Sequence, residues 1–269
     1  MGYKLLVSDL DGTLVGHDLR LTARTVEACR ALAAHGCAVT FATGRAWHGT
    51  LALAQELDLT TPVIAYQGAV ARHHDGRPPL WHDTIPMDVA GEILTWLHKR
   101  SAKVSVCQGE EMVLSYAHDR TIAFLENIGI TVRVAPRLHA ELTEAPTRIA
   151  IFGDPAEMGD WARKLQKAFP GEMRIARTLG HLVEVTHPRA TKGQAITRLA
   201  EWMGITLADV VALGDNYNDA DMIATAGLGV AMSDAPADVL ATAGRIIPRE
   251  APEGIADFLE EMVASLRQG

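Results

Sequence analysis

Short apolar segments alternate with amphipathic helical patterns in the first and last parts of the chain, and this alternation constrains the fold more than any other feature. In the first part, apolar strands are predicted at residues 3–7, 37–42 and 62–66, with helices at 22–35 and 47–57 between them. In the last part the alternation continues through helices at 191–203, 219–226, 235–242 and to about 266, and strands at 210–213, 228–231 and 245–247. This order predicts an α/β fold in which helices cover both faces of a doubly wound, Rossmann-like parallel sheet.

The middle of the chain follows a different pattern. Apolar segments flank tight turns at Gln108-Gly109 and Leu179-Gly180, which is typical of antiparallel hairpins. Helices are predicted between the hairpins, one of them opened by Asp154-Pro155. We therefore predict that residues 82–187 form an α+β domain inserted into a core made of residues 1–81 and 188–269.

The composition of the chain limits the kinds of binding partner and the cellular compartment that we expect for it. The 25 lysines and arginines are outnumbered by 33 aspartates and glutamates, and the net charge of −8 argues against nucleic-acid and membrane partners. Three cysteines without metal-ligand spacing, and no apolar run near ~18 residues, predict a cytoplasmic protein with free thiols. The usual NAD and ATP loops are missing, and no histidine is assigned a catalytic role.

The strongest local signal is Asp9-Leu10-Asp11-Gly12-Thr13-Leu14, directly after the first strand. Two carboxylates this close repel each other, and a bound divalent cation is the usual way to relieve that repulsion. A calcium-binding loop is excluded because the positions that require glycine and glutamate hold Leu14 and Arg20. A solvated turn is the alternative for this segment taken alone.

A second pair of acids, Asp215 and Asp219, follows the strand at 210–213. Ligands of parallel α/β sheets collect at the carboxyl ends of the strands, so these acids are candidates for holding a cation. Asp219 has an alternative role as the N-cap of the helix that follows.

Two shorter motifs suit a phosphate group. Thr43-Gly44-Arg45 places a hydroxyl, a glycine and helix-start amides after the second strand. Lys192 lies at a helix start, where its charge opposes the helix dipole and a nearby anion would compensate. The plain alternatives are a loop before a helix and a surface lysine.

Taken in order, DLDGTL at 9–14, TGR at 43–45, TKG at 191–193 and GDNYND at 214–219 resemble the four motifs of the haloacid-dehalogenase-like (HAD) phosphatases. The large insertion between the second and third motifs resembles the α/β cap of the Cof-type sugar-phosphatase branch. The resemblance spans nearly the whole chain. It implies a HAD core and a cap that sets substrate specificity.

The resemblance also implies roles for the acids. Asp9 would be the nucleophile that becomes an aspartyl phosphate, and Asp11 would be the general acid and base. Mg²⁺ would be held by Asp9, by the backbone carbonyl of Asp11 and by Asp215, with Asp219 in support.

Other motif residues would bind the substrate. The resemblance assigns the transferring phosphoryl group to Thr43, the amide of Gly44, Lys192 and Asn218. Relatives commonly have asparagine where this chain has Gln67, and the longer side chain leaves that contact open.

The expected function is therefore that of a Mg²⁺-dependent phosphatase of small phosphorylated metabolites, with sugar phosphates favoured, in a monomer or homodimer. A sugar phosphomutase or phosphotransferase is one alternative, and a non-enzymatic phosphate- or metal-binding regulator is another. Polar residues of the inserted domain are expected at its surface: Gln108, Glu110, His118, Arg148, His181 and Glu184.

Overall fold

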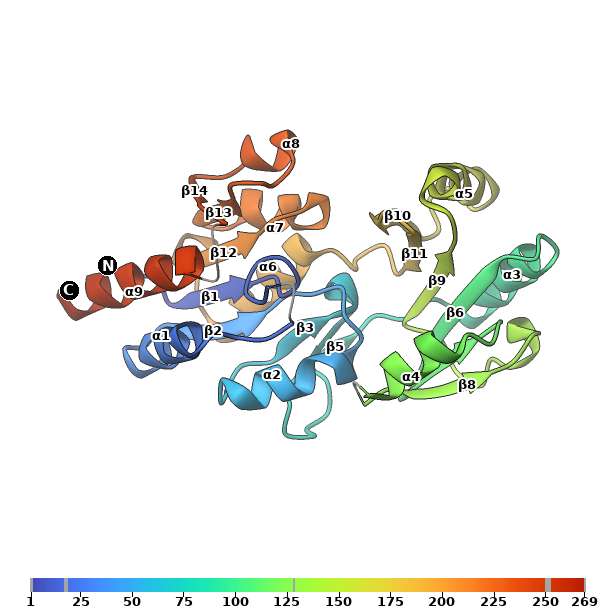
Figure 1. The fold of residues 1–269 in the computed structure, drawn as a ribbon, viewed down its shortest axis with the longest axis horizontal. Helices are drawn as coiled ribbons and strands as arrows, with labels where there is room; N and C mark the ends of the chain where they lie inside the picture. Colours follow the sequence, from blue (N-terminus) through green and yellow to red (C-terminus); the bar gives the residue numbers. More distant parts are fainter. Residues whose placement is uncertain (1, 17–18, 128, 250–252, 269) are drawn as a thin grey trace. The chain divides into compact units, whose positions relative to one another are not determined.

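The computed structural model describes residues 2–16, 19–127, 129–249 and 253–268. The chain divides into two compact units (Figure 1): Met1–Trp81 together with Thr191–Gly269, and His82–Ala190. Cys29, Cys37 and Cys107 are buried and carry free thiols. No helix in the described ranges combines the length and apolar character that a membrane span requires.

A five-stranded parallel sheet lies at the centre of the first unit, in the order β14-β13-β12-β1-β2. Its strands are β1 (Leu5–Ser8), β2 (Ala38–Phe41), β12 (Val210–Gly214), β13 (Leu228–Met232) and β14 (Arg245–Ile247). Leu5, Leu6 and Val7 of β1 are all fully buried, as expected for a parallel strand covered on both faces. The predicted parallel α/β architecture is confirmed.

Helices pack around this sheet in two groups. Leu5 and Val7 of β1 pack with Ile196 and Leu199 of α6 (Lys192–Met203). In the second group, α1 (Ala23–Ala34) and α9 (Glu253–Gln268) lie side by side (Figure 1). The remaining helices of the unit are α2 (Leu51–Glu56), α7 (Ala220–Thr225) and α8 (Ala237–Leu240).

Capping side chains set the helix starts that matter for the site. The hydroxyl of Thr22 accepts a hydrogen bond from the amide of Thr25 at the start of α1, and Thr191 accepts one from Gln194 at the start of α6. Gly204, in the left-handed conformation, ends α6. The cap at Thr191 fixes Lys192 as the first residue of α6.

The third predicted strand departs from the parallel sheet. β3 (Val63–Ala65) has no continuous ladder with β2 among the described residues, and an isolated parallel bridge links Ala42 to Ile64. It instead forms a three-stranded sheet with β4 (Val70–Arg72) and β5 (Trp81–His82). The cause is a sharp reversal directly after β3, where Tyr66 and Gln67 both have positive φ. The sequence pattern did not indicate β4 or β5.

The second unit contains a six-stranded sheet in the order β10-β11-β9-β6-β7-β8, antiparallel except between β7 and β8. Its strands are β6 (Lys103–Gln108), β7 (Glu111–Leu114), β8 (Thr131–Val134), β9 (Arg148–Phe152), β10 (Arg174–Leu179) and β11 (Leu182–Thr186). Its helices are α3 (Met87–His98), α4 (Asp119–Asn127) and α5 (Pro155–Ala168). An apolar core joins α3 and α5 to one face of this sheet. The predicted hairpins and the separate antiparallel sheet are confirmed.

Three polar residues of this unit lie inside it, which corrects the expectation of surface positions. Glu110, His118 and His181 are exposed as expected, but Gln108, Arg148 and Glu184 are buried. Arg148 Nη1 donates to Glu184 Oε1 at 2.6 Å. The two residues lie on adjacent strands, β9 and β11, whose register places them diagonally opposite each other. A buried charge is tolerated because it is paired.

Candidate functional site

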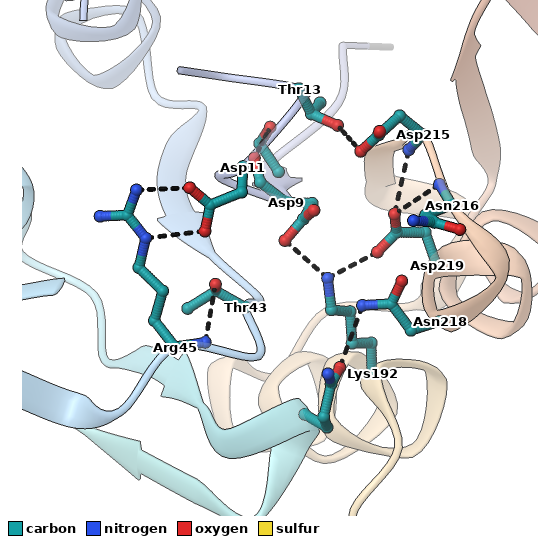
Figure 2. A network of polar contacts seen from close by, with 12 residues as sticks. Asp9, Asp11, Thr13, Thr43, Arg45, Lys192, Asp215, Asn216, Asn218 and Asp219 are labelled. Carbon is teal, nitrogen blue, oxygen red and sulfur yellow. Dashed lines mark hydrogen bonds and ion pairs between the residues drawn. The ribbon is translucent and has the colours of Figure 1, made fainter. Parts of the chain in front are cut away.

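The site residues follow the carboxyl ends of adjacent strands. Ser8, the last residue of β1, pairs with Phe41 of β2 on one side and Leu213 of β12 on the other. Asp9 comes next, and its amide donates to the carbonyl of Leu213 at 2.8 Å. The loops after β1, β2 and β12 therefore meet at one edge of the sheet, where Lys192 also lies (Figure 2).

Lys192 is the buried cation that contacts Asp9. Its Nζ donates to Asp9 Oδ1 at 2.6 Å and to Asp219 Oδ1 at 2.5 Å (Figure 2), and the residue is only 1% exposed. Charge-assisted hydrogen bonds of this kind are strong when water is excluded. The two aspartates supply the anions that the position of Lys192 at a helix start requires.

Burial is the largest single influence on the pKa values of Asp9, Lys192 and Asp215. Burial and the charge of Asp219, only partly offset by Lys192, raise the pKa of Asp9 from 3.8 to about 7. Burial also raises the pKa of Asp215. Burial disfavours the charged form of Lys192, but the attraction of Asp219 and Asp9 outweighs it, and the pKa of Lys192 is raised. Lys192 therefore offsets only part of the effect that burial and Asp219 have on the pKa of Asp9.

Asp219 organises the loop after β12. Its Oδ2 accepts the backbone amides of Asp215 and Asn216, both at 3.0 Å, while its Oδ1 accepts from Lys192. The carboxylate makes no capping bond to α7, although Asp219 occupies the N-cap position of that helix. Gly214 is required beside it, because a Cβ at Gly214 would clash with Asp219 Cβ. Asp219 thus holds the loop that presents Asp215.

Three carboxylates form a possible cation site. One oxygen from each of Asp9, Asp215 and Asp219 lies within 4.8 Å of the other two. An all-oxygen donor set suits a hard divalent cation such as Mg²⁺. Thr13 Oγ1 donates to Asp215 Oδ1 at 2.8 Å and orients that carboxylate. The residues present therefore fit a Mg²⁺ ion.

Asp11 is not part of this acidic group. Arg45 holds both of its carboxylate oxygens, with Nε 2.8 Å from Oδ2 and Nη2 2.5 Å from Oδ1 (Figure 2). The side chain of Asp11 is 47% exposed. The two aspartates of the first motif therefore have different surroundings. Asp9 is buried and accepts a hydrogen bond from Lys192, whereas Asp11 is half exposed and forms an ion pair with Arg45.

The remaining predicted residues are joined through Gln67. Thr43 Oγ1 accepts the amide of Arg45 at 3.1 Å, and Asn218 Nδ2 donates to Gln67 Oε1 at 3.1 Å. A Cβ at Gly44 would clash with Gln67 Nε2, so a larger residue would displace the glutamine amide from its present position. The glutamine bridges the loops that carry Gly44 and Asn218.

Sequence reasoning missed two arginines and the role of this glutamine. Arg45 lies inside a motif that was identified, but nothing in the motif indicated a pair with Asp11. Arg249 contacts Asp215 with its Nη2 at 3.1 Å, across 34 positions of sequence, and carried no signal at all. Gln67 was noticed as a departure from the usual residue, although its contacts could not be read from the sequence.

The sequence is similar to those of known proteins. The model of the haloacid dehalogenase-like hydrolase family matches residues 6–259. The chain is 25% identical over 260 residues to the 5-amino-6-(5-phospho-D-ribitylamino)uracil phosphatase YitU of Bacillus subtilis, and the match covers 96% of each protein.

Two solved structures share the fold. A haloacid dehalogenase-like hydrolase from Bacteroides thetaiotaomicron has a TM-score of 0.87 at 24% identity, over 97% of this chain and 99% of that one. The HAD subclass IIB sugar phosphatase BT4131 has a TM-score of 0.81 at 23% identity, over 96% of this chain and 98% of its own.

Proposed function

Since the chain belongs to the haloacid dehalogenase-like hydrolase family and is a phosphatase, we propose that it hydrolyses small phosphorylated metabolites with Mg²⁺ through an aspartyl phosphate. Sugar phosphates are the favoured substrate class. The proposal is carried by the buried Lys192, which holds the candidate nucleophile Asp9 at 2.6 Å beside Asp215 and Asp219. Residues 1–81 and 188–269 would be the catalytic core, and residues 82–187 the cap.

Asp9 carries the covalent step. One of its carboxylate oxygens attacks phosphorus, and the bond from phosphorus to the ester oxygen breaks as Asp11 gives that oxygen a proton. A water molecule then attacks the phosphoryl group and transfers a proton to Asp11. The bond from phosphorus to Asp9 breaks, which releases inorganic phosphate and restores both carboxyl groups.

Asp11 has to move before it can act. Arg45 holds both carboxylate oxygens, so Asp11 must part from Arg45 to reach a leaving oxygen. Asp11 is half exposed, so solvent screens its ion pair with Arg45 and water can replace the lost hydrogen bonds, which lowers the cost of that rotation. The same rotation would leave a guanidinium at the mouth of the site for an anionic group of the substrate.

The phosphoryl oxygens would be bound by groups from two loops and one helix. Thr43 and the amide of Gly44 come from the loop after β2, Asn218 comes from the loop after β12, and Lys192 comes from α6. These donors stand in fixed positions because packing and hydrogen bonds hold their loops. Preorganised donors of this kind stabilise the charge of phosphoryl transfer.

Asp9, Asp215 and the backbone carbonyl of Asp11 would hold the metal, with Asp219 supporting the loop. A bound Mg²⁺ supplies the positive charge that allows an anionic carboxylate to approach an anionic phosphate. The raised pKa values of Asp9 and Asp215 support this assignment, because burial and the neighbouring carboxylate of Asp219 disfavour their charged forms and a bound cation would favour them.

The substrate class is supported by named relatives. YitU is named for a substrate with a phosphorylated ribityl chain, and BT4131 is named a sugar phosphatase. Both names describe esters whose leaving group carries several hydroxyls. We extend this class to the present chain.

A panel of phosphorylated metabolites, assayed for released phosphate with Mg²⁺ and with EDTA, tests the proposal. We expect sugar phosphates to be hydrolysed and EDTA to lower the rate by at least about 100-fold. Conversion of a sugar 1-phosphate into the 6-phosphate with negligible free phosphate would indicate a phosphomutase. Binding of phosphate or metal without turnover of any ester would indicate a regulator.

Gln67→Asn is expected to raise KM for phosphate esters by about three- to tenfold, the effect of losing one neutral hydrogen bond. The shorter amide cannot both accept from Asn218 and pack on Gly44. The fold is expected to tolerate the change, because asparagine accepts a positive φ such as the 60° found at Gln67. Steady-state kinetics and thermal melting test this, with the exposed Gln55→Asn as control; an unchanged KM would contradict it.

A further inference from the structure

Arg249 brings a second positive charge to the candidate metal ligands. Its Nη2 lies 3.1 Å from Asp215 Oδ2, its Nη1 donates to the backbone carbonyl of Gly12, and its Nε donates to Asp234 Oδ1. One guanidinium therefore joins a candidate metal ligand, the loop that carries Asp9, and an acid outside the metal group.

The loops that Arg249 joins are already in close contact. Gly12 has a φ of +87°, and a Cβ at this position would lie 2.6 Å from Asp215 Oδ2. Arg249 itself follows β14, so it reaches the site from a third loop. A rigid, forked side chain with several donors can hold such a junction together, and a lysine could not do so equally well.

The two contacts of Asp215 differ in charge. Thr13 is a neutral donor to Oδ1, and its hydrogen bond can persist when a metal binds. Arg249 is a cation at Oδ2, and a divalent ion bound at the same carboxylate would be repelled by it. Binding of Mg²⁺ at Asp215 therefore competes with the ion pair to Arg249.

Arg249 has another partner that lies outside the metal group. The side chain of Asp234 is 55% exposed and that of Arg249 is 30% exposed, and the two are already in contact. The guanidinium can give up Asp215 and keep Asp234, because neither side chain is enclosed.

We propose that Arg249 is an internal counter-ion of Asp215, which holds the carboxylate and the Gly12 loop before metal binds and withdraws toward Asp234 when Mg²⁺ binds. This inference rests on the proposed Mg²⁺ site. It makes Arg249 a positioning residue that weakens metal affinity while it keeps the two loops in place.

Calorimetric titration of the full chain with Mg²⁺ tests the proposal. Arg249→Met removes the charge and keeps most of the length, and we expect it to bind Mg²⁺ about tenfold more tightly than the wild type. The metal-free variant is expected to melt at a lower temperature and to gain more from added Mg²⁺. Arg30→Met, which removes a surface arginine paired with Asp58, is the matched control and leaves Mg²⁺ affinity unchanged.

A double-mutant cycle tests the part played by Asp234. Asp234→Asn is expected to weaken Mg²⁺ binding about threefold in the wild type, because Asp215 is then the one carboxylate that Arg249 contacts among the described residues. In the Arg249→Met background, the same substitution is expected to have a smaller effect. Equal effects in both backgrounds would overturn the withdrawal of Arg249 toward Asp234.

The outcomes separate this inference from the proposed function. If the wild type binds no Mg²⁺, or if Asp215→Asn binds it equally well, the proposed metal site is wrong. If binding depends on Asp215 but Arg249→Met binds Mg²⁺ equally or more weakly, only the counter-ion role is overturned. Should Arg249→Met not fold, Arg249→Lys decides: it keeps a charge without the fork and is expected to bind Mg²⁺ more tightly by a smaller factor.

Discussion

Asp9→Asn is expected to lower turnover by at least about 10⁴-fold, because an amide cannot attack phosphorus as a carboxylate does. The substitution keeps the size of the side chain and an oxygen that can still accept from Lys192. Stopped assays of phosphate release with Mg²⁺ measure the effect. Asp58→Asn, an exposed position with positive φ, is the matched control. Residual activity near that of the wild type would remove Asp9 from the nucleophile role.

The same variant is expected to fold as well as the wild type or better. Asp9 has an ordinary pKa of 3.8 when unfolded and a pKa of about 7 when folded. Between pH 3.8 and about pH 7, Asp9 is protonated in the folded state and ionised in the unfolded state. The free energy of unfolding therefore falls as the pH rises across this window. The neutral amide of the Asp9→Asn variant avoids that cost above pH 7. A melting temperature at pH 8 well below that of the metal-free wild type would contradict this account.

Lys192→Met is expected to lower the free energy of unfolding by about 3–5 kcal/mol, the usual loss when one partner of a buried ion pair is removed. The residue is only 1% exposed, and its removal leaves Asp9 and Asp219 buried without their cation. Activity is expected to be lost as well, since no other cation contacts Asp9 in the described part of the chain. Urea unfolding at pH 8 and pH 5.5 measures the loss.

The pH dependence of the stability lost in Lys192→Met separates the contribution of charge from that of packing. At pH 5.5 Asp9 can be protonated, because its pKa is raised, and one of the two uncompensated charges disappears. The loss of stability is therefore expected to be smaller at pH 5.5 than at pH 8. Lys4→Met, whose side chain is 56% exposed and pairs with Asp209 at 3.2 Å, is the control and is expected to cost under about 1 kcal/mol. An equal loss at both pH values would assign the effect to packing.

Much of the site could be predicted from where polar residues follow apolar strands. In a parallel sheet the carboxyl ends of the strands lie at one edge, so the sequence alone predicts that Asp9, Thr43 and Asp215 lie close together. The register of β1 with β2 and β12 gives that expectation its physical basis. Lys192 was found by a different signal, a charge placed against a helix dipole.

The missed features depend on contacts without a local pattern. The reversal at Tyr66 and Gln67 is set by backbone conformations that these residue types rarely adopt, so β4 and β5 were not foreseen. The buried pair Arg148–Glu184 depends on the register of β9 with β11. Arg249 reaches Asp215 from a separate loop, and a lone arginine after a strand is common. The roles of the individual site residues stay predictions until the variants are measured.

The position of β1 in its sheet has a consequence for biosynthesis. β2 follows β1 closely in the chain, but β12 lies on its other side, and Thr13 and Asp215 are 202 positions apart. During synthesis on the ribosome, the edge of β1 that pairs with β12 therefore has no partner until the inserted unit and β12 have been made. The candidate site can form only after Asp215 has been synthesised, about 200 residues after Thr13.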